Sequence, residues 1–405
     1  MSHINGNSKS CCGCSACYVA CPRKAIVMMQ DQEGFMIPSV NETYCINCGI
    51  CERICPAINK QAFSKIESDI NAFAFQSNDD AVRYKSASGA FFPTLAKYII
   101  EEKIGYVSGC VLDEHLMPKH IVTNNINDIK KMQDSKYVQS NIDESFRIIE
   151  SLLKDDKWVL FTGTSCQVAG LLSLVKHKGI SSEKLITVDF FCHGTPSPLM
   201  WKEFLSFYQK ETGRLIKGVR FRNKKYLWGR ASRGSHAKMN IYYENKFGKK
   251  KSDFTSLVST VWYSLFWSNR CLRQYCYHCP YASINKPAEI TMADFWGIED
   301  IAPDFNDKKG CSLVLTRNKK ADSLIKALNN VSIKEVDLEK AIKKQGNAFK
   351  PSNQPNDREA FWKDFQLHGF EYNAKKYFDY SYKRKIKNSI KNILFFLHLR
   401  GYKGM

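Results

Sequence analysis

The sequence predicts an α+β protein with three parts: a small cysteine-rich domain at the N-terminus, a larger α/β body and a helical basic tail. Three observations lead to this architecture. Eight of the sixteen cysteines form two runs of identical spacing within the first 56 residues. From residue 72 onward, strand-like apolar runs alternate with helix-like segments. Near the C-terminus, residues 374–405 hold nine Lys or Arg against the single Asp379.

The two cysteine runs have the spacing that holds [4Fe-4S] clusters in bacterial ferredoxins. In such domains the fourth cysteine of each run reaches the cluster of the other run. We therefore expect a ferredoxin-type domain over residues 1–65 with two clusters on crossed sets of ligands. The expected ligands are Cys11, Cys14, Cys17 and Cys55 for the first cluster, and Cys45, Cys48, Cys51 and Cys21 for the second. Cys12 lies outside the spacing, and we expect it to be a spare thiol.

Zinc ribbons and disulfides fit these runs poorly. Structural zinc takes four ligands in two pairs, whereas here two complete sets of four have equal spacing. Disulfides need an oxidising compartment, and the N-terminal sequence MSHINGNSKS has no apolar run that would direct export. We therefore expect a cytoplasmic protein whose thiols stay reduced.

The size and charge of the chain bound its domains and partners. A chain of 405 residues is too long for one ferredoxin module. The formal charge of +20 favours acidic partners, such as a small acidic ferredoxin or flavodoxin that donates electrons. We expect no nucleic acid as a partner, because no recognition motif accompanies the charge. No apolar stretch reaches the length of a membrane span.

The body shows the alternating order of strands and helices that is typical of a partly parallel sheet. We divide it into residues 66–155 and 156–345, followed by the tail over 346–405. The expected helices are 89–103, 143–154 and 253–269. The expected strands are 72–76, 104–113, 158–162, 185–191, 219–222, 238–243, 288–296 and 312–317.

Cysteines follow two of these strands and form a second candidate group. Ligands gather at the carboxyl ends of parallel strands, where Cys166 and Cys192 fall. With the Cys276-x2-Cys279 pair they could surround a third cluster. A C-x2-C pair can equally be a redox pair or half of a zinc site, so the spacing leaves these alternatives open. Cys271 is the first substitute ligand to consider.

No nucleotide-binding motif accompanies these strands. The chain has neither a G-x-G-x-x-G turn after a strand nor a Walker loop. The segment Ser88-Gly89-Ala90 before a helix could cradle an anion, with Ser88 as the cap. The alternative interpretation is that Ser88 only caps the helix and that no anion binds there.

Taken together, these segments resemble the beta-subunit family of coenzyme F-420 hydrogenases and dehydrogenases, in the long form with a two-cluster ferredoxin domain in front. The matching pieces are collinear and span nearly all of residues 11–316. They are SASGAFFPTLA (86–96), SKYVQS (135–140), LFTGTSCQVAGL (160–171), VDFFCHGTPSPLMW (188–201), CLRQYCYHCPYA (271–282), AEITMADFWGI (288–298) and KGCSLVLT (309–316).

The resemblance implies a flavoprotein that holds FAD without a Rossmann motif, beside a third cluster on Cys166, Cys192, Cys276 and Cys279. It also implies flavin-lining residues, with a lysine that stabilises charge on the reduced flavin. These are Ser88, Gly89, Ala90, Lys136, Tyr137, Gln139, Ser140 and Asp294. The chain departs from the family pattern at Ala90 and Ala293, where the family favours glycine, and at Ser165, where it favours proline.

The function expected from these features is a flavin-dependent iron-sulfur oxidoreductase. Electrons from an acidic donor would pass through the clusters to FAD and on to a small organic acceptor. The alternative is a non-catalytic electron-transfer subunit of a larger redox complex. His193, directly after Cys192, is the candidate proton donor, and its alternative role is structural. The substrate, the direction of electron flow, the use of the deazaflavin coenzyme and the oligomeric state stay open.

The basic tail adds a further candidate surface. Its segment IKNSIKNILFFLHL places apolar residues on one helical stripe with lysines opposite: Ile386, Ile390, Ile393, Leu394 and Leu397. Such a stripe could lie in a membrane interface, making the protein peripheral at the inner face of the membrane. The alternative is a terminal helix docked on the body.

Overall fold

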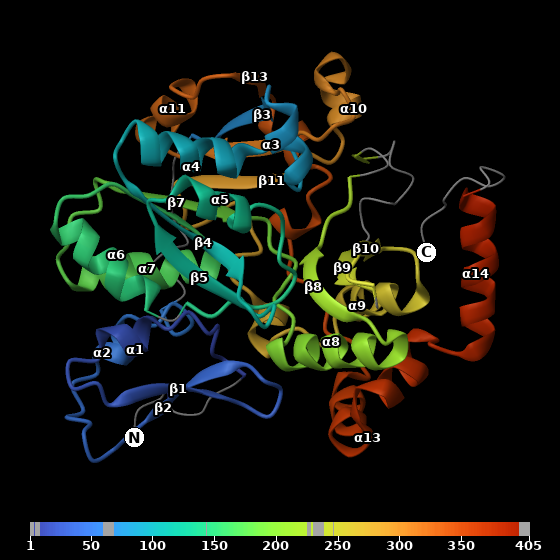
Figure 1. The fold of residues 1–405 in the computed structure, drawn as a ribbon. Helices are drawn as coiled ribbons and strands as arrows, with labels where there is room; N and C mark the ends of the chain where they lie inside the picture. The colour runs from blue at the N-terminus through green and yellow to red at the C-terminus, as the bar shows by residue number, and fades with distance from the viewer. Residues whose placement is uncertain are drawn as a thin grey trace.

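The computed structural model describes residues 4, 9–59, 69–142, 144–224, 228–229, 239–245 and 247–396 (Figure 1). The N-terminal domain has two short helices, α1 (Ala16–Ala20) and α2 (Ile50–Arg53), each inside one cysteine run. Between them, β1 (Ile26–Gln30) and β2 (Met36–Val40) form an antiparallel hairpin. Its turn is fixed by Asp31, whose Oδ1 accepts from the backbone N–H groups of Glu33 and Phe35. The predicted ferredoxin-like repeat is therefore present.

An eight-stranded mixed sheet forms the centre of the body, in the order β13-β3-β12-β11-β7-β6-β4-β5. The strands from β4 through β6 and β7 to β11 are parallel, and the remaining pairs are antiparallel. The sheet joins strands from both sides of residue 155, so the expected division there falls within one sheet. Its strands are β3 (Asn71–Ser77), β4 (Tyr106–Leu112), β5 (Pro118–Thr123), β6 (Val159–Thr162), β7 (Leu185–Phe190), β11 (Ile290–Asp294), β12 (Ser312–Thr316) and β13 (Val331–Val336).

Helices cover both faces of this sheet. One face packs on α4 (Phe91–Glu101), α5 (Ile126–Met132) and α11 (Lys319–Lys326) through a buried apolar cluster. The other face packs on α6 (Ser145–Lys154) and α7 (Ser165–His177) through a second cluster, part of which comes from the N-terminal domain beneath these helices (Figure 1). Three further short helices belong to the body: α3 (Asp80–Lys85), α10 (Ile298–Ile301) and α12 (Leu338–Ile342).

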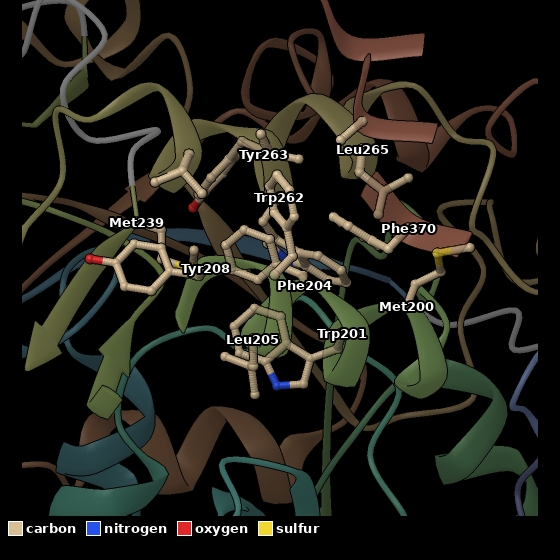
Figure 2. Close-up of a cluster of buried hydrophobic side chains, with 14 of the residues drawn as sticks. Met200, Trp201, Phe204, Leu205, Tyr208, Met239, Trp262, Tyr263, Leu265 and Phe370 are labelled. Atoms are coloured by element: carbon tan, nitrogen blue, oxygen red, sulfur yellow. The ribbon is translucent and has the colours of Figure 1, made fainter. Parts of the chain in front are cut away.

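A second, smaller unit lies beside the sheet. Strands β8 (Leu215–Arg220), β9 (Asn240–Glu244) and β10 (Lys250–Asp253) form an antiparallel sheet. It packs with α8 (Pro198–Thr212), α9 (Leu257–Trp267) and α13 (Arg358–Phe378) around an aromatic core (Figure 2). Trp201 and Trp262 meet there with ring centroids 4.8 Å apart. The last described helix is α14 (Tyr382–Phe396), and no helix among the described residues is long and apolar enough to cross a membrane.

Two buried arginines fasten the N-terminal domain to the body. Arg273 is 1% exposed and donates from Nη1 and Nη2 to the carbonyl oxygens of Cys11 and Met36, both at 2.7 Å. Arg358 forms a bidentate ion pair with Glu33 in the hairpin turn. Buried charged hydrogen bonds of this kind hold a fixed geometry. The two cysteine-lined sites of the domain therefore have set positions relative to the body.

Candidate functional site

The eight cysteines of the two runs line two cavities in the N-terminal domain. Each cavity takes three cysteines from one run and the fourth from the other run, as the spacing predicts. The first is lined by Cys11, Cys14, Cys17 and Cys55, and the second by Cys21, Cys45, Cys48 and Cys51.

The two halves share a backbone pattern that opens these cavities. Gly13 and Asn47 occupy equivalent places and have φ of 71° and 51°, and Ser15 and Gly49 have φ of 62° and 69°. Left-handed residues turn the chain sharply, so backbone N–H groups can point at sulfur. The N–H of Gly13 donates to Sγ of Cys11 at 3.3 Å. Hydrogen bonds to cysteine sulfur are one of the features that tune iron-sulfur clusters.

The second group of cysteines meets at a third, smaller cavity in the body. Cys166 lies in the first turn of α7, Cys192 follows β7, and Cys276 and Cys279 lie at the short 3₁₀ segment Gln274–His278. All four line this cavity. Among the described residues no three His, Cys, Asp or Glu side chains close on a single ion.

Burial dominates the chemistry of these four thiols. It raises the pKa of Cys276 above its usual value and that of Cys279 to about 12, and it helps raise that of Cys192 well above its usual value. The pKa of Cys166 is also raised, by a hydrogen bond with Cys12 and by burial, so the N-terminus of α7 does not produce a thiolate by itself. Thiolates there need a compensating positive charge, which an iron-sulfur core provides.

Tyr275 and Cys271 indicate which groups could bind in this cavity. The hydroxyl of Tyr275, which lines the cavity and is 5% exposed, has no hydrogen-bond partner among the described residues. A buried donor without a partner is costly, and the sulfur atoms of a cluster would satisfy it. Cys271 is fully buried against the aromatic core and does not line this cavity. The geometry therefore does not favour Cys271 as a substitute ligand.

Cys12 has a position that the sequence did not indicate. It is 3% exposed and lines both the first cavity and the cavity of the second cysteine group. Cys14 lines the first of these cavities with it, and Cys166 lines the other. A thiol expected to be spare is thus the contact between two candidate cluster sites.

A much larger cavity, of about 800 Å³, adjoins the body cysteines. It lies where β6, β7 and β11 end and where α4 begins, the place at which ligands bind in open α/β sheets. The residues from Cys192 to Thr195 line both this cavity and the small one. A ligand in the large cavity would therefore be a direct neighbour of a cluster in the small one.

Six of the eight predicted flavin residues line the large cavity: Ser88, Ala90, Lys136, Tyr137, Ser140 and Asp294. Gly89 stands just behind its wall, where its N–H donates to Oγ of Ser312 at 3.0 Å. Gln139 points elsewhere: its Nε2 donates to the carbonyl oxygen of Cys12 at 3.1 Å, and its Oε1 accepts from Arg273. Gln139 therefore helps to hold the N-terminal domain.

The start of α4 differs from the expected serine cap. The N-cap residue is Ala90 with φ of 69°, and no side chain caps the helix. Ser88 instead hydrogen-bonds Ser312, with 2.9 Å between the two Oγ atoms. The N–H groups of Phe91 and Phe92 in the first turn of α4 thus lie beside the cavity, whereas Pro93 has none, and a helix start favours an anionic ligand. The positive φ also explains why the family favours glycine at position 90.

Lys136 does not have the free charge that the sequence suggested. Its Nζ donates to the carbonyl oxygens of Met132 at 2.7 Å and Gln133 at 2.8 Å, and so caps the end of α5. Burial lowers the pKa of Lys136. One cation beside the cavity that pairs with a carboxylate is Arg222, with Nη2 2.8 Å from Oδ2 of Asp294 and Nη1 2.9 Å from the Tyr137 hydroxyl.

Two histidines line the large cavity, and their partners differ. His193 has both ring nitrogens engaged: Nε2 is 2.7 Å from Oδ1 of Asn269, and Nδ1 is 3.3 Å from Oγ of Ser352. These contacts favour a structural role. His120 was not predicted. Its Nε2 lies 2.9 Å from the carbonyl oxygen of Thr162, while its buried Nδ1 has no partner in the described part of the chain.

His120 stands directly across the β4–β5 pair from Cys110, which also lines the cavity. Burial lowers the pKa of His120 to about 4, and the charge of Lys136 adds to this effect. Burial raises the pKa of Cys110 to about 11. Because the register of two strands decides this pairing, the sequence offered only one signal, a lone histidine in an apolar stretch.

Comparisons with known proteins agree with this arrangement. Residues 156–341 match the family described as the C terminus of the beta subunit of coenzyme F420 hydrogenase/dehydrogenase, and residues 10–58 match a 4Fe-4S dicluster domain. A coenzyme F420-dependent sulfite reductase from Methanocaldococcus jannaschii is 25% identical over 171 residues, 42% of this chain and 26% of that protein. Pyruvate synthase subunit PorD from Thermotoga maritima is 36% identical over 50 residues, 12% of this chain and 46% of that protein.

The chain thus spans less than half of the length of either relative. Among solved structures, a chain from the F420-reducing [NiFe] hydrogenase complex of Methanosarcina barkeri is similar over 76% of this chain and 91% of its own length. The identity is 16% and the TM-score is 0.43. The two family matches cover the cysteine runs and most of the body. The chain therefore belongs to the coenzyme F420 hydrogenase/dehydrogenase beta-subunit family, in the form that carries a 4Fe-4S dicluster domain in front.

Proposed function

We propose that the protein is a flavin-dependent iron-sulfur oxidoreductase that passes electrons from a small acidic ferredoxin- or flavodoxin-type donor to an organic acceptor. One observation carries the proposal. The segment from Cys192 to Thr195 lines both the cavity of four cysteines and the cavity of about 800 Å³. This adjacency is what a protein needs if it joins single-electron carriers to chemistry on carbon.

The residues present fit the groups that the proposal requires. Two crossed sets of cysteines would hold two [4Fe-4S] clusters, and Cys166, Cys192, Cys276 and Cys279 would hold a third. FAD would lie in the large cavity, with its phosphates at the uncapped start of α4. When bound, the clusters would supply single electrons and the flavin the paired transfer that carbon acceptors take.

The chain's own residues would supply charge and protons in the large cavity. Arg222, held by Asp294 and Tyr137, would orient an anionic group of the ligand. His120 would exchange a proton through Nδ1, because the contact with Thr162 occupies Nε2. His193 would keep the Cys192 loop in place through Asn269 and Ser352.

The donor would approach the second cysteine cavity of the N-terminal domain. Cys48, which lines it, is exposed. Arg23, Lys24 and Arg53 are exposed close to it in the chain. An acidic carrier would be steered to such a surface at low ionic strength. Because Cys48 is exposed whereas the four body cysteines are partly buried beside the large cavity, this order would place the acceptor at the end of the chain of sites away from the donor.

The alternative is a non-catalytic electron-transfer subunit of a larger redox complex. The solved relative belongs to a hydrogenase complex, and PorD is named as a subunit. This reading predicts iron-sulfur clusters without a bound flavin in the purified chain. Coenzyme F420, named in the sulfite reductase relative, is one acceptor to assay.

Anaerobic reconstitution distinguishes these functions. We expect about twelve irons and one flavin per chain, and we expect Cys166→Ser to lower the iron count by about four. Cys271→Ala is the matched control and should retain the full count. About eight irons without flavin would favour the alternative, and about two zinc ions would contradict both.

A further inference from the structure

Helix α14 is attached to the body by its polar side. Asn388 is 7% exposed and donates from Nδ2 to the carbonyl oxygen of Thr255 at 2.9 Å. Lys385 pairs with Glu211 of α8, with Nζ 2.9 Å from Oε2. A helix of this length normally buries its apolar stripe against its own domain. Among the side chains of α14 that the structure describes, those that hold the helix are an amide and a lysine.

The apolar stripe of α14 faces outward as a result. Ile386, Ile390 and Ile393 are 46%, 55% and 59% exposed, and Tyr382 at the start of the helix is 79% exposed. Their spacing places them on one face. Leu397 lies outside the described residues, as does the side chain of Leu394. Helix α14 is therefore docked on the body, which was one of the two expectations for the tail. It is docked through its polar side, so the three isoleucines are exposed to solvent.

Charge along one side of this stripe limits what could cover it. Lys383 and Lys387 are exposed and lie along one edge of the isoleucine stripe. A second copy of the chain would bring the same lysines against these, which like-charge repulsion disfavours. An acidic electron donor would need to sit near the N-terminal domain, which lies across the molecule from α14 (Figure 1). An anionic lipid surface matches both features, since its headgroups attract lysine and its acyl boundary accepts isoleucine.

We propose that the outward face of α14, formed by Tyr382, Ile386, Ile390 and Ile393 with Lys383 and Lys387, docks the protein on an anionic bilayer surface. The isoleucines would enter the headgroup region while the lysines contact lipid phosphates. Because α14 stands at the opposite side of the molecule from the N-terminal domain, the exposed Cys48 would stay open to a soluble carrier (Figure 1). The inference does not depend on the proposed redox function.

Vesicle flotation of the full chain tests this surface. The probes are vesicles of phosphatidylcholine alone and of phosphatidylcholine with phosphatidylglycerol. We expect binding only to the anionic vesicles. Ile386→Ser, Ile390→Ser and Ile393→Ser together should abolish flotation, and each of Lys383→Gln and Lys387→Gln should weaken it roughly fivefold.

Matched control variants distinguish binding through this face from non-specific binding through other exposed apolar residues. Val27, Ile104 and Ile148 are 51%, 76% and 44% exposed on other elements, and their joint change to serine should leave flotation intact. Iron content and thermal unfolding should stay the same in every variant, because the changed side chains lie in water. Flotation that survives the isoleucine changes would overturn the proposal. So would the absence of flotation, or a dimer without lipid that the same changes dissociate.

Discussion

Arg273 donates from Nη1 to the carbonyl oxygen of Cys11 at 2.7 Å, across the boundary between the N-terminal domain and the body. The same side chain binds Met36 and Gln139. A residue of the 3₁₀ loop that carries Cys276 and Cys279 thus fixes the first residue of the first cysteine run. The guanidinium group of Arg273 thus helps to set the distance between the candidate cluster sites.

We expect Arg273→Met to lower the free energy of unfolding by about 3 to 5 kcal/mol, because it leaves buried carbonyl groups without donors. Denaturant unfolding measures the change. Arg270→Met is the matched control, since Arg270 is 23% exposed and pairs with the partly exposed Asp357. It should cost about 1 kcal/mol. Equal losses from the two changes would show that Arg273 does not join the domains.

Gly170 in α7 allows the close approach of the first cysteine run. A Cβ added at Gly170 would lie 2.8 Å from Sγ of Cys14. Alanine normally stabilises the interior of a helix by up to about 1 kcal/mol, but here we expect Gly170→Ala to destabilise the protein and to lower its iron content. Gly218→Ala is the control, because its nearest neighbour is at an ordinary 3.8 Å. A stabilised Gly170→Ala variant with full iron would contradict the packing.

Ala90 is an L-residue in a left-handed conformation, with φ of 69°. Replacing it by glycine removes a strain of about 1 kcal/mol, partly offset by the greater freedom of the unfolded chain. We expect Ala90→Gly to be neutral or to raise the free energy of unfolding by a few tenths of a kcal/mol. Ala96→Gly, in the middle of the same helix, should lower it by about 1 kcal/mol. Thermal unfolding of the two variants gives the comparison.

The lowered pKa of His120 should make the free energy of unfolding depend on pH. Its pKa is lowered to about 4 in the folded protein, so the unfolded chain binds a proton first as the pH falls below about 6.5. The folded state therefore loses stability between about pH 6.5 and 4, by up to about 3 kcal/mol. His120→Gln should reduce this loss, whereas the exposed His368→Gln should not. Urea unfolding at several pH values measures the slopes, and identical slopes for His120→Gln and the parent would contradict the assignment.

The local parts of this architecture could be predicted from sequence because spacing determines them. The crossed cysteine sets follow from the repeated run, and the strands before Cys166 and Cys192 follow from unbroken apolar segments. Six of the eight residues that the resemblance implied for the flavin line the large cavity. In each case the signal lies within a few residues of the feature.

Long-range partners explain what could not be predicted. Gln139 and Ser140 are neighbours in sequence, yet one binds the N-terminal domain and the other lines the cavity. The apolar stripe of α14 faces outward because Asn388, on the other side of the helix, donates a hydrogen bond to the carbonyl group of Thr255. None of these contacts has a local pattern.

The position of Cys12 has a consequence for handling the protein. Cys12 lines the same small cavity as Cys166, one residue on each side of the domain boundary. If iron is lost in air, these two sulfurs are placed to oxidise to a disulfide, which would cross-link the N-terminal domain to the body. Preparations exposed to oxygen would then resist reloading with iron until a thiol reductant is added.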